Sequence, residues 1–350
     1  MDPNLVLGFA FILLGAICGG SFGLPSKFVA KTTPWENLWG PFFFFATLLI
    51  PVTLGPLVVK GLFATASAAG FNVILWPLVF GLLWGFGSMT LGLSFAFIGL
   101  SLAYAINYGA QIAFGSIVPM AIHHPETILT PQGFVVMAGV AACLLGVVVS
   151  GRAGILKTAS LQKSQPAAAD GMDKQPRIFT GQAIAFISGL LCACYAVAFS
   201  FGGPVMDISQ NQFGNPAWSS TFMVTALILW GGSLSACGYC IYKLCRNRTW
   251  KNFASPGIGK TLLLALIMAC LHDGAILFWG LGVPKLGRLG VSVGYASFMS
   301  FAIIVGNVNG FLTGEWKGAG RNSVNWIIAG IIILIIGVCI LAVSNTMAAG

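Results

Sequence analysis

Charged side chains are scarce in this chain of 350 residues, where Asp, Glu, Lys and Arg together make up 7%. An ordinary soluble globular protein carries roughly 25%. Hydrophobic residues account for 57% of the chain, and 46 positions are glycine. So little charge cannot cover a water-exposed surface, whereas abundant glycine suits the close packing of helices in a bilayer. The composition therefore argues against a soluble domain and predicts a membrane protein.

Signatures of several other classes are absent as well. The chain has no G-x-x-x-x-G-K-[S/T] sequence, which excludes nucleotide-driven pumping by such a loop. Its first residues lack the basic region of a cleavable signal peptide, so we expect the first apolar segment to remain as a helix. The nine cysteines lie in or beside apolar segments and are interpreted as reduced packing residues. Cys237 and Cys240 have C-x-x-C spacing, but without a second pair they do not predict redox or metal chemistry.

Ten apolar segments follow one another along the chain. Each is close to the length of about 20 residues that a helix needs to cross roughly 30 Å of hydrocarbon. Helices are required there because hydrocarbon cannot satisfy exposed backbone groups. The predicted segments are 5–24, 38–59, 73–97, 100–122, 133–150, 180–201, 219–242, 261–283, 289–313 and 325–344.

Basic residues are distributed unequally between the two sets of loops. Of the 17 Lys and Arg residues, 14 lie in the loops that follow the first, fifth, seventh and ninth segments. The other loops contain Lys60, Lys285 and Arg288. Because Lys and Arg favour the cytoplasmic side, this pattern places the 14-residue side in the cytoplasm and both termini outside. A missed segment would disturb the alternation, so the distribution also supports a count of ten.

The longest polar gap separates the ten segments into two groups of five. We assign residues 1–155 to a first five-helix repeat, 156–177 to a flexible cytoplasmic linker and 178–350 to a second five-helix repeat. Because each half crosses the membrane an odd number of times, the two halves must be inverted relative to each other.

Sequence similarity between the halves supports this division. The sequence GLSLAYA from Gly99 in the fourth segment resembles GVSVGYA from Gly290 in the ninth. The same offset of 191 residues relates Gly146 of the fifth segment to Gly337 of the tenth. Inverted repeats are typical of alternating-access transporters, whose substrate sites lie near the midplane between the repeats. The predicted fold class is an all-α membrane protein with ten transmembrane helices arranged as a 5+5 inverted repeat.

Short motifs along nearly the whole chain resemble one known family. They are Pro25-Ser-Lys27, Trp35-Glu36-Asn-Leu-Trp39, Leu83-Trp84-Gly85-Phe-Gly87, Gly92-Leu93, Ile98-Gly99-Leu-Ser101, Gly151-Arg152-Ala-Gly154 and Glu315-Trp316-Lys317-Gly-Ala-Gly320-Arg321. On these motifs the chain resembles the L-rhamnose–proton symporter family of the drug/metabolite transporter superfamily. The resemblance implies a multi-pass carrier of the bacterial inner membrane that imports L-rhamnose or a related deoxy-sugar together with a proton. It implies no enzymatic activity, no cofactor besides the proton gradient and no nucleic-acid partner.

Polar and aromatic side chains share one face of the fourth segment. Tyr104, Asn107, Tyr108 and Gln111 are spaced at i, i+3, i+4 and i+7. A sugar presents many hydroxyl groups and flat apolar faces, which amides and aromatic rings bind well. We therefore predict that these four residues bind substrate. The alternative is that they form hydrogen bonds between helices, with no ligand involved.

Other segments supply further candidates for substrate binding. The ninth contains Tyr295, in the repeated motif, and Asn307; because Asn307 and Asn309 cannot share a helical face, we expect at most one of them at the cavity. Trp84 and Trp279 lie within the third and eighth segments and could stack on a sugar ring. Packing in the helical core is the competing interpretation for both indoles.

His272 and Asp273 lie near the middle of the eighth segment. A charged side chain at that depth costs roughly 2.5–3.5 kcal/mol on insertion scales, so such residues usually mark an ion or substrate pathway. We predict that Asp273 holds the coupling proton and that His272 assists it. Adjacent helical positions point about 100° apart, so the two side chains need not face the same cavity. The alternative is a structural Asp273 that fixes helix packing.

Titratable residues at the segment ends allow other interpretations. Glu36 and Glu315 lie beside basic residues and are expected to form surface ion pairs of little energetic value. A gating ion pair between Lys27 and one of these two carboxylates is the alternative. His123 and His124 resemble a metal cluster, although adjacent histidines have poor ligand spacing. No metal site is predicted.

Two other functions compete with sugar–proton symport. The first is a facilitator or exporter of another small metabolite in the same superfamily, in which Asp273 would be structural. The second is a membrane enzyme that acts on a lipid-linked sugar, which would require clustered acids or histidines at the membrane interface. The sequence favours the symporter because its polar residues lie within the apolar segments.

Overall fold

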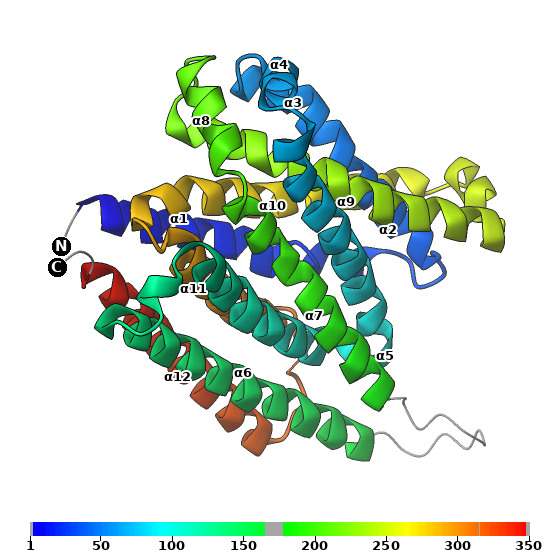
Figure 1. Cartoon of the computed structure of the whole chain (residues 1–350). Coiled ribbons are helices and arrows are strands. Elements are labelled where there is room, and N and C mark those ends of the chain that lie inside the picture. Colours follow the sequence, from blue (N-terminus) through cyan, green and yellow to red (C-terminus); the bar gives the residue numbers. More distant parts are fainter. Residues whose placement is uncertain (1–2, 165–177, 315, 348–350) are drawn as a thin grey trace.

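The computed structural model describes residues 3–164, 178–314 and 316–347, and every regular element within these ranges is a helix (Figure 1). Ten helical segments in them are long and apolar enough to cross a membrane. This confirms the predicted all-α membrane fold class and its ten crossings. The ten segments are Pro3–Phe28, Trp35–Val58, Phe71–Ser94, Leu102–His123, Pro131–Lys157, Phe179–Asn211, Ala217–Asn247, Ile258–Leu286, Gly290–Leu312 and Arg321–Ser344.

The individual helices divide between the two halves of the chain. The first half contains α1 (Pro3–Ser21), η1 (Leu24–Phe28), α2 (Trp35–Phe44), η2 (Phe45–Leu49), α3 (Ile50–Val58), α4 (Leu62–Ala69), α5 (Phe71–His123), η3 (Pro125–Thr127) and α6 (Pro131–Ser164). The second half contains α7 (Ile178–Ser200), α8 (Gly203–Asn211), α9 (Ala217–Asn247), η4 (Thr249–Ala254), α10 (Ile258–Gly282), η5 (Val283–Leu286), α11 (Gly290–Leu312) and α12 (Arg321–Thr346).

Helix α5 contains two crossings, Phe71–Ser94 and Leu102–His123. In a straight helix Gly87 and Asn107 would lie about 30 Å apart, since each residue rises 1.5 Å. The hydroxyl of Ser188 nevertheless donates a hydrogen bond to the Gly87 carbonyl at 2.7 Å and accepts one from Asn107 Nδ2 at 2.8 Å. The chain therefore turns back between the two crossings, as Figure 1 shows for α5.

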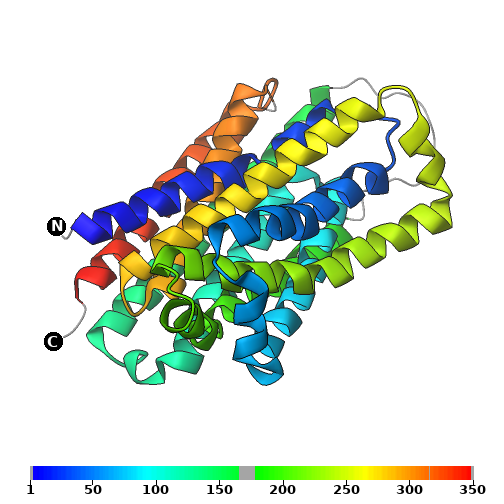
Figure 2. The ribbon, with the colours of Figure 1, turned by 90° about the horizontal axis from the view of Figure 1, so that it is seen from above.

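Most of the close helix packing joins the first half of the chain to the second. Helix α6 packs on α12, α2 packs on α9, and α5 packs on both α7 and α11. Helix α1 lies beside α10 and α11, and Figures 1 and 2 both show α1 and α10 side by side. The crossings in Leu102–His123, Ala217–Asn247 and Gly290–Leu312 have the largest buried shares, 61%, 67% and 61%. Two of these three crossings carry six of the eight predicted sugar-binding residues, and Trp84 and Trp279 lie in less buried crossings.

Contacts between loops agree with the predicted alternation across the membrane. Arg288 after the eighth crossing contacts Glu126 after the fourth, and Asn215 after the sixth holds the backbone of Lys60 after the second. On the opposite side, Lys27 donates a hydrogen bond to Thr313. Each of these contacts joins loops that ten crossings place on one side. Figures 1 and 2 also show that α1 begins and α12 ends at the same end of the bundle.

The predicted linker is helical where the structure describes it. Helix α6 continues to Ser164, so positions 156–164 extend the fifth crossing beyond the apolar segment. The Ser160 hydroxyl accepts a hydrogen bond from the backbone N–H of Gly320, and Lys157 lies over the ring of Trp316. Positions 165–177 lie outside the described residues.

Candidate functional site

A cavity lies within the membrane-spanning part of the bundle, between α1, α5, α7, α10 and α11. The structure brings six of the ten predicted site residues together in its lining. They are Trp84, Tyr108, Gln111, His272, Trp279 and Tyr295. Apolar side chains such as Phe298 and Met299 complete the wall. A concave, mainly apolar space with a few convergent polar groups is the usual form of a small-molecule site. We call this space the central cavity.

Aromatic rings pack edge to face along one wall of the central cavity. The ring centroids are 6.0 Å apart for Trp84 and Tyr195, 5.6 Å for Tyr195 and Trp279, and 5.7 Å for Trp279 and Tyr295. Edge-to-face geometry stabilises such pairs beyond their burial and holds the rings in fixed orientations. The indole N–H of Trp279 is buried and has no hydrogen-bond partner among the described residues. A bound polar molecule could accept that hydrogen bond.

A buried chain of hydrogen bonds supports the polar side of the cavity. Tyr295 Oη donates to Gln111 Oε1 at 2.7 Å, and Gln111 Nε2 donates to Asn107 Oδ1 at 2.5 Å. Asn107 Nδ2 in turn donates to the Ser188 hydroxyl at 2.8 Å. Asn107 is fully buried and is not part of the cavity lining. It therefore orients the Gln111 amide from behind, and the structure does not place it where a ligand would touch it.

A second cavity lies beside the first, toward the end of the bundle that carries Lys27. It brings together the remaining sugar-site candidates, Tyr104 and Asn307, and Tyr108 lines both cavities. Asn307 and Asn309 both line this space, so the expectation that only one of them reaches a cavity is wrong. Asn309 also donates to Ser21 at 2.8 Å and ties α11 to α1, whereas Asn307 donates to a carbonyl of its own helix.

The predicted proton-coupling pair is formed by neighbouring residues that face different surroundings. His272 Nδ1 lies 2.9 Å from Asp273 Oδ1. The imidazole lines the central cavity, but Asp273 does not. The second carboxylate oxygen of Asp273 is buried without a hydrogen-bond partner among the described residues. The two side chains are therefore joined by a hydrogen bond, and His272 is the one that lines the cavity.

Sequence reasoning missed several residues of the cavity wall. Tyr195 is buried in α7 and its hydroxyl shares a hydrogen bond with Thr225 at 3.2 Å. Cys192, on the same helix, lines the cavity, and its carbonyl oxygen lies 3.3 Å from the Tyr295 hydroxyl, as a longer alternative acceptor to Gln111. Tyr195 was the one polar aromatic in the sixth apolar segment, which could have identified it. No pattern in α7 identified Cys192, because its contribution comes partly from the backbone.

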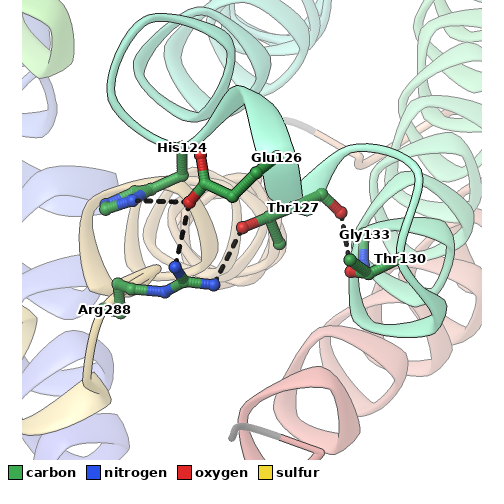
Figure 3. Close-up of polar contacts among 6 residues, drawn as sticks. All are labelled: His124, Glu126, Thr127, Thr130, Gly133 and Arg288. Carbon is green, nitrogen blue, oxygen red and sulfur yellow. Dashed lines mark hydrogen bonds and ion pairs between the residues drawn. The ribbon is translucent and has the colours of Figure 1, made fainter.

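An ion-pair cluster joins two loops at the end of the bundle opposite Lys27. Arg288 Nη1 lies 2.9 Å from Glu126 Oε1, and Nη2 donates to the Thr127 hydroxyl at 2.9 Å (Figure 3). His124 Nδ1 lies 3.6 Å from the same Glu126 oxygen. A hydrogen bond from its own backbone N–H and the charge of Arg288 lower the pKa of Glu126. We call Arg288, Glu126 and Thr127 the outer clamp.

The residues considered as a metal cluster have other partners. His123 Nε2 lies 3.0 Å from the hydroxyl of Ser200, and His124 approaches Glu126. Among the described residues, no group of three or more His, Cys, Asp or Glu side chains could hold a metal ion. His123 thus joins the ends of α5 and α7, and His124 contacts its own loop.

Glu36 does not form the surface ion pair that we expected. Its side chain is 2% exposed, and Oε1 accepts hydrogen bonds from Asn247 Nδ2 and the Thr249 hydroxyl, both at 2.8 Å. Because α2 packs on α9, the start of α2 lies against the end of α9, where neutral donors satisfy the carboxylate. The other acid in that prediction, Glu315, lies outside the described residues.

A ten-helix membrane bundle that encloses aromatic rings, buried amides and a His–Asp pair has the features of a membrane carrier for small polar molecules. Comparison with known proteins agrees. The family model described as L-rhamnose-proton symport protein (RhaT) matches residues 1–349. The chain belongs to this family, which is a family of transporters and not of enzymes.

Curated relatives match the chain over nearly its whole length. The L-rhamnose-proton symporter of Citrobacter koseri is 24% identical over 343 residues, covering 96% of this chain and 97% of the relative. The protein with the same name from Escherichia coli O1:K1 / APEC is 22% identical over 351 residues, covering 98% and 99%. That of Salmonella paratyphi A is 24% identical over 344 residues, covering 96% and 97%.

Proposed function

We propose that this protein is a secondary active transporter that imports L-rhamnose or a related deoxy-sugar by proton symport. It acts in the bacterial inner membrane, with both termini in the periplasm, and it alternates access to the central cavity between the two sides. The observation that carries this proposal is the central cavity itself, which combines aromatic rings, an oriented amide and a His–Asp pair inside the spanning helices. The family membership and the names of the curated relatives support the substrate and the coupling ion.

The cavity chemistry suits a sugar. The Gln111 amide is fixed by Tyr295 on one side and Asn107 on the other, so its orientation is set before a ligand arrives. Trp84 and Trp279 offer ring surfaces for the apolar face of a sugar, and the Trp279 N–H offers a donor for one of its hydroxyl groups. A molecule with both hydroxyl groups and an apolar face uses all of these features.

The packing of the helices supports two inverted halves. The offset of 191 residues pairs Gly139 with Gly330 and Gly146 with Gly337. A Cβ atom at Gly146 would lie 3.1 Å from the Gly330 carbonyl oxygen, and one at Gly337 would lie 3.2 Å from that of Gly139. The offset converts one contact into the other, because it replaces Gly146 by Gly337 and pairs Gly139 with Gly330. In the order of crossings, the first corresponds to the sixth and the fourth to the ninth. The packing of α1 (first) on α11 (ninth) therefore corresponds to the packing of α7 (sixth) on α5, which contains the fourth. Rocking of such halves about a shared interface provides alternating access.

Uptake into proteoliposomes tests the proposal. Purified protein in vesicles with an inward proton gradient should accumulate radiolabelled L-rhamnose above its external concentration, and a protonophore should abolish the accumulation. Uptake that merely equilibrates and ignores the gradient would identify a facilitator and reject symport. Absence of L-rhamnose transport under all gradients would reject the named sugar. Protein-free vesicles are the control for leakage.

A further inference from the structure

His272 lies in a cage of aromatic rings at the edge of the central cavity. The centroid of its ring is 5.6 Å from that of Trp84, 5.7 Å from Phe22 and 5.6 Å from Phe42. These rings come from α5, from the segment that follows α1, and from α2, so three parts of the first half surround one residue of the second. Aromatic faces within about 6 Å attract a cation. The three centroids lie within this distance, at interplanar angles of 36° for Trp84, 72° for Phe22 and 89° for Phe42, so His272 has aromatic surroundings that can accommodate an imidazolium.

Asp273 determines which nitrogen of His272 is available. With an ionised Asp273, Nδ1 carries the hydrogen and donates it to Oδ1 at 2.9 Å. The other nitrogen, Nε2, then has a free lone pair, and it has no hydrogen-bond partner among the described residues. A carboxylate that fixes the tautomer of a histidine and stabilises its protonated form is a well-known arrangement in proton-transfer sites.

Few other titratable groups surround this pair. Among the described residues they are the thiols of Cys18 and Cys270 from α1 and α10, Cys192 and Tyr195 from α7, Tyr104 and Tyr108 from α5, and Tyr295 from α11. Thiols and phenols are neutral at physiological pH. On the elements packed against the ends of α10, Glu36 is held by Asn247 and Thr249, and Lys27 contacts Thr313. Among the described residues, Asp273 is the ion-pair partner of His272.

We infer that His272, and not Asp273, accepts the transported proton, and that Asp273 is a positioning residue behind it. This inference rests on the proposed symport function and divides the roles within the predicted pair. The proton passes from water in the cavity to the Nε2 lone pair, and the imidazole becomes an imidazolium while Asp273 stays ionised. The charge of the pair changes from −1 to 0. Release to water on the other side restores the neutral ring.

The same geometry connects the proton to the sugar. Trp84 lines the central cavity and also belongs to the cage around His272. Protonation attracts the ring face of Trp84 and fixes its orientation, so a sugar that stacks on this indole binds better when His272 is charged. By linkage, the proton and the sugar strengthen each other's binding to the same extent.

Two variants separate the roles of the pair in the vesicle assay. With His272→Gln, gradient-driven accumulation of L-rhamnose should fall to equilibration, because the ring nitrogen that accepts the proton is lost. With Asp273→Asn, accumulation should persist, but its pH profile should shift toward acid because the imidazolium loses its anionic neighbour. Undiminished accumulation by His272→Gln would overturn the inference. So would a loss of all pH response in Asp273→Asn alone. A wild-type protein that ignores the gradient would instead refute the proposed symport.

A spectroscopic measurement does not depend on transport. The chain contains three histidines, so the variant His123→Asn/His124→Asn leaves His272 alone for nitrogen-15 NMR. Its Nε2 resonance should change with protonation between pH 5 and 8, and both L-rhamnose and the added Asp273→Asn substitution should alter that response. An imidazole that stays neutral throughout this range, in a variant whose uptake still depends on pH, would assign the proton to Asp273 and overturn the inference.

Discussion

The central cavity and the outer clamp use polar contacts of similar length in opposite surroundings. Tyr295 and Gln111 are 2.7 Å apart and only 2% and 4% exposed. Arg288 and Glu126 are 2.9 Å apart, but their side chains are 55% and 59% exposed. A buried group that loses its partner cannot turn to water, whereas an exposed one can. The neutral network at the centre should therefore dominate binding, and the charged clamp should contribute little in spite of its full charges.

Among the substitutions that test this comparison, Gln111→Leu should cause the largest change, a loss of L-rhamnose affinity. The substitution leaves the Tyr295 hydroxyl and the Asn107 carbonyl oxygen buried with fewer partners. It also removes the amide that is proposed to hydrogen-bond the sugar; leaving a sugar hydroxyl without that buried partner costs about 1–3 kcal/mol, so L-rhamnose affinity should fall roughly 5- to 150-fold. Calorimetric titration of the purified protein measures the change. The matched control is Gln132→Leu, whose amide donates to the Ser344 carbonyl away from both cavities. Equal affinities for the Gln111 variant and wild type would remove this amide from the site.

Tyr295→Phe should have a smaller effect in the same direction. The ring remains packed 5.7 Å from that of Trp279, and only the hydroxyl that orients Gln111 is lost. We expect affinity to decrease by roughly five- to tenfold, which corresponds to about 1 kcal/mol for one hydrogen bond. Tyr239→Phe, whose ring packs against Trp35, is the control. A Tyr295→Phe loss larger than that of Gln111→Leu would mean that the hydroxyl contacts the sugar directly.

Arg288→Gln should change uptake by no more than about fivefold, since exposed ion pairs are worth roughly 0–1 kcal/mol. Salt screens such pairs. Raising the ionic strength should therefore bring the uptake rate of the wild type closer to that of the variant. The uptake rate of the variant itself should stay nearly unchanged. Initial uptake rates at low and high salt measure this difference. A loss greater than tenfold would show that the clamp is more than an exposed contact between loops.

Glu126→Gln should have the smallest effect, on the pH profile. The folded-state pKa of Glu126 is lowered. Its ionised carboxylate therefore stabilises the folded protein at any pH above the ordinary pKa of Glu, and this stabilisation is lost only as the pH falls through the lowered pKa. Its ionisation therefore stays constant between pH 5 and 8. The variant should keep the wild-type shape of uptake against pH in this window. A flattened profile would place pH sensing in the clamp and not at the centre.

Composition and length were sufficient to predict the ten crossings, because hydrocarbon allows few alternatives to apolar helices. The sequence also predicted that Tyr104, Tyr108 and Gln111 share one helical face, since helical spacing determines which side chains lie together. The same spacing could not separate Asn107, which turns toward Ser188, from Gln111 at the cavity. That distinction depends on how α7 packs against α5.

Partners from distant parts of the chain were harder to predict. Glu36 was expected at the surface because it lies beside basic residues at a segment end, but the end of α9 buries it. The aromatic cage of His272 combines residues 22, 42 and 84 with residue 272. Such contacts are set by tertiary packing, which a local pattern does not contain.

A structure determined with L-rhamnose tests the central claim most directly. The account predicts sugar density in the central cavity, against the rings of Trp84 and Trp279 and within hydrogen-bond distance of the Gln111 amide. Density confined to the second cavity beside Asn307, or between loops at the outer clamp, would contradict it.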